Sequence, residues 1–241
     1  MKLISAVTVL LASAMMVACA SDPTSRDPAK LTDFQAEKKL KEAWLYSLGD
    51  GQADAYPRIA PVIDGDEIFI ASSNGKVAAL KKSNGKKVWK ESYDLRISGG
   101  VGVSGTLLFL GTSDGEIVAI DRLSGDIVWK TQVSSEVLSA PQSNGSVVVA
   151  QTYSGDVQGF NFEDGKLLWS YSSQVPRLTL RGTSTPKVVG GIVMIGFANG
   201  RVMAFDIDNG TQLWEQRISV PQGSTEIERL VDVDGRLLVM E

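Results

Sequence analysis

The residue types that most enzymes use for chemistry are scarce in this chain of 241 residues. The sequence contains no histidine and a single cysteine, Cys19. Histidine supplies most general acid–base pairs and many zinc and copper ligands, so its absence excludes those sites and the usual catalytic triads. The run from Asp206 to Gly210 has the acidic spacing of a calcium-binding loop, but its glycine comes one position too early. We expect a turn there, and no metal site.

Cys19 is the one residue for which covalent chemistry is expected. A positive charge at Lys2 and an apolar run over 3–17 precede it. The run is too short for a membrane-spanning helix and is typical of a secretory signal. The order Met16-Val17-Ala18-Cys19 is similar to the bacterial lipobox, in which the cysteine is lipidated and becomes the mature N-terminus. We predict a signal peptide at 1–18 and lipidation of Cys19; the alternative is an incidental cysteine in an ordinary signal peptide.

The composition of the chain limits its partners. Residues 19–43 are predicted to be the lipidated N-terminus and a tether, because 20–33 are polar and contain two prolines. The chain as a whole is 43% hydrophobic and 22% charged, which is typical of a folded protein. Its net charge is −4, and no basic cluster interleaved with aromatic residues is apparent. Nucleic acid is therefore not an expected partner.

An internal repeat positions the remaining residues. The segment from Gly105 to Trp129 matches 65–89 and 145–169 at shifts of 40 residues, and 190–214 at a further shift of 45. Each copy holds two β-rich runs around an Asn-Gly, Asp-Gly or Ser-Gly pair, which predicts a hairpin. A further strand precedes each hairpin, and another ends at a tryptophan. Four antiparallel strands in about 40 residues are typical of a propeller blade. We predict an all-β fold over 44–241, a β-propeller of four-stranded antiparallel blades with about four blades present.

The tryptophans are predicted to join neighbouring blades. Small residues occupy one equivalent position in the four copies, and a tryptophan ends each copy: Ala79, Ala119, Gly159 and Ala204, with Trp89, Trp129, Trp169 and Trp214. We expect each indole to pack over the small residue and the turn glycine of an adjacent blade, burying ~150–250 Å². An aromatic ligand box is the alternative. Trp44 has no hairpin before it and is predicted to lie in an outer strand without a blade of its own.

The repeat resembles the PQQ-like, quinoprotein-type blade in endings such as AIDRLSGDIVW and AFDIDNGTQLW. Segments outside the repeat resemble the BamB family of outer-membrane β-barrel assembly lipoproteins: ISGGVGVSG (97–105), LTLRGTSTP (178–186) and RIS-x3-GSTEIERLVDVDG (217–235). The resemblance implies an eight-bladed ring, so the domain is expected to be incomplete at its C-terminal end; a self-closed ring of four blades is the alternative. Ala20 after the lipobox implies a lipid-anchored location at the periplasmic face of the outer membrane.

Two connections are longer than the repeat predicts. Trp169 to Pro186 spans 17 residues where Trp129 to Pro141 spans 12, and 222–235 lengthens the next connection. Long connections after successive tryptophans are expected on the same side of a propeller, where they form a mixed apolar and charged surface suited to a protein partner. The resemblance implies that such residues contact a POTRA domain of BamA: Leu178, Leu180, Arg181, Asp232 and Asp234. Simple loop architecture is the alternative.

The resemblance implies a non-enzymatic scaffold of the β-barrel assembly (BAM) complex, with no cofactor and no catalytic residue. The implied partners are BamA, other BAM components and unfolded outer-membrane β-barrel precursors. Quinoprotein dehydrogenases use a catalytic aspartate, calcium ligands and commonly a vicinal disulfide, which one cysteine cannot form. The alternatives are a periplasmic quinoprotein-type enzyme or a fragment of one, and a structural or carbohydrate-binding propeller lipoprotein.

Overall fold

The computed structural model describes residues 30–33, 35, 37–38, 40–49 and 58–239. The chain divides into two units, Met1–Lys41 and Glu42–Glu241. The predicted signal peptide and Cys19 lie outside the described residues. Within the described ranges, no helix has the length and hydropathy needed to cross a membrane. All regular elements of this part of the chain are strands, and they belong to the second unit.

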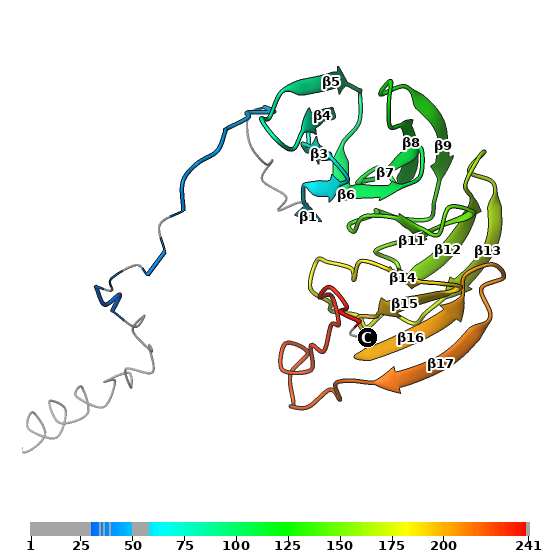
Figure 1. Ribbon diagram of the computed structural model, residues 1–241. Helices are drawn as coiled ribbons and strands as arrows, with labels where there is room; N and C mark the ends of the chain where they lie inside the picture. The colour runs from blue at the N-terminus through cyan, green and yellow to red at the C-terminus, as the bar shows by residue number, and fades with distance from the viewer. Residues whose placement is uncertain (1–29, 34, 36, 39, 50–57, 240–241) are drawn as a thin grey trace, which may run out of the picture. The chain divides into compact units, whose positions relative to one another are not determined.

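Four antiparallel sheets, which we call blades 1 to 4, follow one another in chain order (Figure 1). Blade 1 contains β2 (Val62–Asp64), β3 (Glu67–Ala71), β4 (Lys76–Lys81) and β5 (Lys87–Ser92). Blade 2 contains β6 (Ile97–Ser104), β7 (Leu107–Thr112), β8 (Glu116–Asp121) and β9 (Ile127–Gln132). Blade 3 contains β10 (Gln142–Ser143), β11 (Val147–Gln151), β12 (Asp156–Asn161) and β13 (Leu167–Ser172). Blade 4 contains β14 (Lys187–Val189), β15 (Ile192–Gly196), β16 (Arg201–Asp206) and β17 (Gln212–Arg217).

The hydrophobic core lies between the blades. Leu108 and Phe109 are neighbours on β7 and are both fully buried, although side chains of successive strand residues point to opposite faces. Leu108 belongs to a cluster shared by blades 1 and 2, whereas Phe109 belongs to a cluster shared by blades 2 and 3. A third cluster joins blades 3 and 4. The continuous apolar runs of the repeat therefore follow from burial of both faces of each blade.

Tryptophans fasten successive blades to one another. The indole N–H of Trp89 donates to the carbonyl of Arg122 over 2.8 Å, Trp129 donates to Phe162 over 2.9 Å, and Trp169 donates to Ile207 over 2.8 Å. Each of these rings lies on the turn glycine of the next blade, and these glycines are Gly125, Gly165 and Gly210. The predicted packing of tryptophan over the turn glycine of an adjacent blade is confirmed.

The predicted place of the small residues was wrong. They pair across the strands with the tryptophan of their own blade: Ala79 with Trp89, Ala119 with Trp129, Gly159 with Trp169 and Ala204 with Trp214. A Cβ on Gly159 would lie 2.3 Å from the Trp169 ring. The small residue therefore makes room for the indole of its own blade, which then leans toward the next blade.

Trp44 packs as the other tryptophans do without lying in a strand. Residues 40–48 form no regular element, so the predicted outer strand was wrong. The Trp44 indole nevertheless donates to the carbonyl of Lys82 over 3.0 Å and lies on Gly85. At the other end of the series, Trp214 is 43% exposed. In the described part of the chain no residue accepts a hydrogen bond from its indole.

One strand lies outside the repeat. Strand β1 (Arg58–Ile59) runs parallel to β6, with Arg58 opposite Gly99. The Ala60 amide continues the pairing by donating to the Gly100 carbonyl over 2.9 Å. This short strand adds a fifth strand to the sheet of blade 2 and holds the Arg58 side chain where it reaches a connection far along the sequence.

Candidate partner-binding site

The two lengthened connections lie against each other. The first joins β13 to β14, and the second follows β17. The Leu180 amide in the first donates to Oδ1 of Asp232 in the second over 3.0 Å. The Val233 amide donates to the Phe197 carbonyl over 3.1 Å, which attaches the second connection to the end of β15. Residues from two blades therefore form one continuous surface.

The two leucines of the first connection face solvent. Leu178 is 41% exposed and Leu180 is 53% exposed, so neither is buried in the core. Leu180 also borders an open groove with Ile218, Leu230 and Val231. Exposed apolar side chains that are gathered on one surface are typical of a protein-binding site. Leu178 and Leu180 are therefore available for contact with a partner.

Arg181 pairs with a residue that sequence reasoning missed. Its Nη2 lies 2.5 Å from Oε2 of Glu136, which belongs to the connection between β9 and β10. The Arg181 side chain thus reaches the connection between blades 2 and 3. Both members of the pair are partly exposed, so the ion pair forms a charged edge beside the leucines.

Asp234 is held by Arg58 of β1. Nη1 of Arg58 donates to the Asp234 carbonyl over 2.7 Å, and Nη2 forms an ion pair with the Asp234 carboxylate. The first connection packs against this pair at Gly182, where a Cβ would lie 3.0 Å from Nη2 of Arg58. Arg58, which the sequence did not reveal as a site residue, therefore supports both connections.

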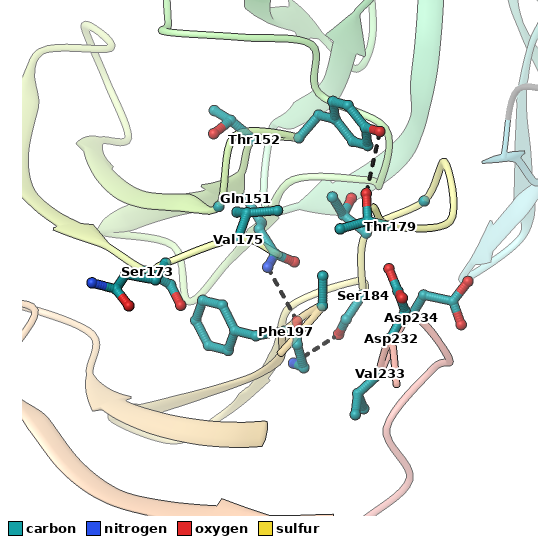
Figure 2. A pocket seen from close by; sticks show the side chains of 17 residues that line it. Gln151, Thr152, Ser173, Val175, Thr179, Ser184, Phe197, Asp232, Val233 and Asp234 are labelled. Atoms are coloured by element: carbon teal, nitrogen blue, oxygen red, sulfur yellow. Dashed lines mark hydrogen bonds between the residues drawn. The ribbon is translucent and has the colours of Figure 1, made fainter. Parts of the chain in front are cut away.

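Asp232 closes a small cavity beneath the first connection. The cavity has a volume of about 20 Å³, and Figure 2 shows Gln151, Thr179 and Asp234 among the residues around it. Nε2 of Gln151 donates to the Gly196 carbonyl over 3.1 Å. Oδ2 of Asp232 is buried without a hydrogen-bond partner among the described residues. Burial raises the pKa of Asp232, the charge of Asp234 adds to this effect, and the Leu180 amide opposes it.

We expect Asp232→Asn to leave the fold intact and to stabilise it slightly at neutral pH. A raised pKa means that the folded chain favours the protonated carboxyl, so ionisation costs stability as the pH rises above the pKa of the unfolded chain. The amide keeps an acceptor for Leu180 and carries no charge. The gain should stay below about 1 kcal/mol because solvent screens a half-buried group.

Urea denaturation of the parent and of Asp232→Asn between pH 4 and pH 8 would measure this effect, and the difference should shrink toward acidic pH. Asp234→Asn is the matched control, since it weakens the ion pair with Arg58 and should lower stability at neutral pH. A variant Asp232→Asn that is less stable than the parent at pH 7 would contradict the proposed cost of the charge.

This surface combines exposed apolar side chains with ion pairs. In the ranges that the structure describes, no group of three or more His, Cys, Asp or Glu side chains could hold a metal ion. The acidic run at Asp206 lies in the turn between β16 and β17, as expected: the Asp206 carboxylate accepts hydrogen bonds from the amides of Asp208 and Asn209. Apolar side chains bordered by ion pairs suit a protein partner.

Comparison with known proteins establishes the family. A family model described as outer membrane protein assembly factor BamB matches residues 6–96 and 84–241. The chain belongs to this family. Relatives named outer membrane protein assembly factor BamB include one from Pseudomonas aeruginosa, 50% identical over 95% of this chain and 61% of its own length, and one from Marinobacter adhaerens, 59% identical over 95% of this chain and 58% of its own length. The chain thus spans about three fifths of the length of these relatives.

Solved structures agree with the BamB family. The crystal structure of BamB from Moraxella catarrhalis superposes with a TM-score of 0.71 at 31% identity, covering 79% of this chain and 57% of that one. A quinohemoprotein alcohol dehydrogenase from Pseudomonas putida reaches a TM-score of 0.54 at 17% identity, covers 73% of this chain and 35% of its own, and shows the shared fold alone. The resemblance to the BamB family and the all-β propeller blades predicted from the sequence are confirmed.

Proposed function

We propose that this chain acts as a non-enzymatic scaffold lipoprotein of the outer-membrane β-barrel assembly complex. A lipid on Cys19 would hold it at the periplasmic face of the outer membrane, and the surface around Leu178 and Leu180 would bind a POTRA domain of BamA. Other BAM components and unfolded β-barrel precursors are the further proposed partners. The proposal includes no cofactor and no catalytic residue.

Membership in the BamB family supports this proposal, since the relatives are named for outer membrane protein assembly. The observation that best supports the binding site is the exposure of both leucines on a connection that the hydrogen bond from the Leu180 amide to Asp232 holds in place. Ordering a loop before association reduces the entropy lost on binding.

The five predicted residues have two different roles on this surface, contact with the partner and support of the first connection. Leu178, Leu180 and Arg181 are exposed enough to contact the partner. Asp232 holds the first connection through the Leu180 amide, and Asp234 holds it through Arg58 and Gly182. Replacing either aspartate with a residue that cannot make these contacts should therefore weaken binding by releasing the leucines, even where the carboxylate itself touches nothing on the partner.

We expect Arg181→Glu to weaken binding of the BamA periplasmic domains at least tenfold, or about 1.4 kcal/mol. The substitution places two carboxylates beside each other at Glu136, and their repulsion displaces the first connection. Asp232→Lys should have a similar effect, because it removes the acceptor for the Leu180 amide. Pull-down followed by titration calorimetry would measure both.

Arg177→Glu is the matched control, since it makes the same charge change on the same connection at an exposed side chain. Its effect on affinity should be less than about threefold. Binding unchanged by both Arg181→Glu and Asp232→Lys would count against the site. Loss of binding in Arg177→Glu of the same size would show that net charge, and not the described contacts, governs the affinity.

A further inference from the structure

Blade 1 carries a cluster of lysines that the other blades lack. Residues 81–92, which we call the lysine segment, contain five lysines and one glutamate. The corresponding segment of blade 2 carries two basic and two acidic residues. That of blade 3 carries one basic and two acidic residues, and that of blade 4 carries one basic and three acidic residues. The segment covers the end of β4, the following turn and β5, so the repeat presents it at the outer edge of the blade.

The charges of the lysine segment are available for binding. Its five lysines are all exposed, and among the described residues none of them forms an ion pair: Lys81, Lys82, Lys86, Lys87 and Lys90. One of the ammonium groups, that of Lys82, donates to the Gly65 carbonyl over 2.7 Å. Val88 lies among the lysines and is 44% exposed. The segment therefore offers positive charge together with one exposed apolar side chain.

The single aromatic residue of the segment is turned away from this surface. Trp89 is buried and donates its indole N–H to the Arg122 carbonyl of blade 2. Binding of single-stranded nucleic acid relies on exposed aromatic rings that stack on bases, and the segment offers none. Its chemistry instead fits an anionic surface that needs only a field of positive charge and a shallow apolar contact.

The chain that leads to the predicted anchor is fastened at the lysine segment. Trp44 donates its indole N–H to the Lys82 carbonyl, and its ring lies on Gly85 of the same turn. Along the sequence, 24 residues lie between Cys19 and Trp44. Of the four equivalent blade turns, the lysine segment is therefore the one joined to the predicted anchor by the shortest stretch of chain.

We propose that the lysine segment binds the anionic headgroups of the phospholipid surface to which the chain is anchored, and that it turns blade 1 toward the bilayer. This inference rests on the lipid anchor of the proposed function. Each lysine near an anionic bilayer strengthens the attraction about fivefold. None of the five lysines belongs to the candidate partner-binding site, so the two surfaces can be tested separately.

Amine footprinting of the full chain on vesicles tests the proposal. The chain, produced with its own signal, is reconstituted into vesicles of phosphatidylglycerol and phosphatidylcholine, and into vesicles of phosphatidylcholine alone. Acetylation of each lysine is then followed by mass spectrometry. We expect the five lysines to react at least about threefold more slowly on the anionic vesicles. The protection should vanish in ~1 M salt, where the screening length falls to about 3 Å.

Lys130 and Lys166 are internal controls, because both are exposed on the outer strands or turns of other blades. Their rates should be equal on the two kinds of vesicle. In a variant with Lys82, Lys86, Lys87 and Lys90 changed to Gln, Lys81 should lose its protection. A variant with Lys130 and Lys166 changed to Gln should keep it.

Equal rates for the five lysines on both vesicles would overturn the proposal, as would equal protection of Lys130 and Lys166 or protection that persists in high salt. Protection by an acidic protein domain without protection by anionic vesicles would also overturn it. The mass of the intact chain separates the lipid anchor from lipid binding by the lysine segment. A chain without lipid on Cys19 would contradict the anchor. Salt-sensitive protection of that same chain by anionic vesicles would still support binding by the lysine segment.

Discussion

Trp129→Ala is expected to lower the free energy of unfolding by about 3–5 kcal/mol. The side chain is only 7% exposed and belongs to the cluster shared by blades 2 and 3. Its ring lies 6.1 Å from that of Phe109, between centroids, and its indole N–H donates to the Phe162 carbonyl. Truncation would leave a cavity between the blades and an unpaired carbonyl. Urea denaturation followed by far-ultraviolet circular dichroism would measure the loss.

Trp214→Ala is the matched control, because the same residue type occupies the equivalent position of blade 4. Trp214 is 43% exposed, and none of the described residues accepts a hydrogen bond from its indole. Its truncation should cost less than about 1 kcal/mol. Equal losses in the two variants would show that tryptophan stabilises each blade from within, through its paired small residue, and not by fastening it to the next blade.

Gly165→Ala is expected to lower the free energy of unfolding by about 2–4 kcal/mol. Gly165 has a φ of +69°, a left-handed conformation that disfavours any residue with a Cβ. A Cβ there would also lie 2.5 Å from the Trp129 ring and 2.7 Å from the Thr131 hydroxyl oxygen. The alanine methyl would therefore push the indole away from blade 3. Thermal and urea denaturation would both report the loss.

Gly190→Ala separates the two causes. Gly190 has a similar φ of +57°, but a Cβ there would meet no atom within 4 Å. Gly190→Ala should therefore lower the free energy of unfolding only by the cost of the left-handed backbone, about 1–2 kcal/mol. If Gly165→Ala were no more destabilising than Gly190→Ala, the close packing of indole on glycine would contribute little to the joint between the blades.

The blades could be predicted from the sequence because their signals are local. The Gly105 to Trp129 segment combines turn pairs, alternating apolar runs and a fixed period, so each hairpin follows from residues within a few positions. The packing of each tryptophan on the next blade also follows from this period. Because the blades repeat regularly, each tryptophan that is followed by another blade meets the equivalent turn glycine of that blade. The position of Ala119 could not be predicted in this way, because the repeat does not say which of two nearby indoles fills the space beside it.

The predicted site residues were found from connection length and from family resemblance, and their supports were missed for different reasons. Glu136 lies in the connection after Trp129, one blade before the connection that holds Arg181, so the rule that successive connections lie side by side could have found it. Arg58 had no such signal. Strand β1 stands outside the repeat, and no pattern in the sequence links it to Asp234.

The expectation that the chain holds no basic cluster interleaved with aromatic residues was wrong, because the lysine segment surrounds Trp89. A net charge of −4 averages five exposed lysines with acidic residues on other blades. Comparing the same segment blade by blade reveals the difference at once. In repeat proteins the departure of one copy from the others is therefore more informative about binding than the composition of the chain.

The bond between Arg58 and Asp234 makes the candidate partner-binding site depend on both ends of the four-blade series. The two residues are 176 positions apart, and the strands of all four blades lie between them. Arg58 precedes Asp234 in the chain and has no carboxylate to hold until the connection after blade 4 has packed in place. A half-made chain therefore cannot present an ordered candidate partner-binding site, and recruitment through that site would be restricted to chains whose four blades have already folded.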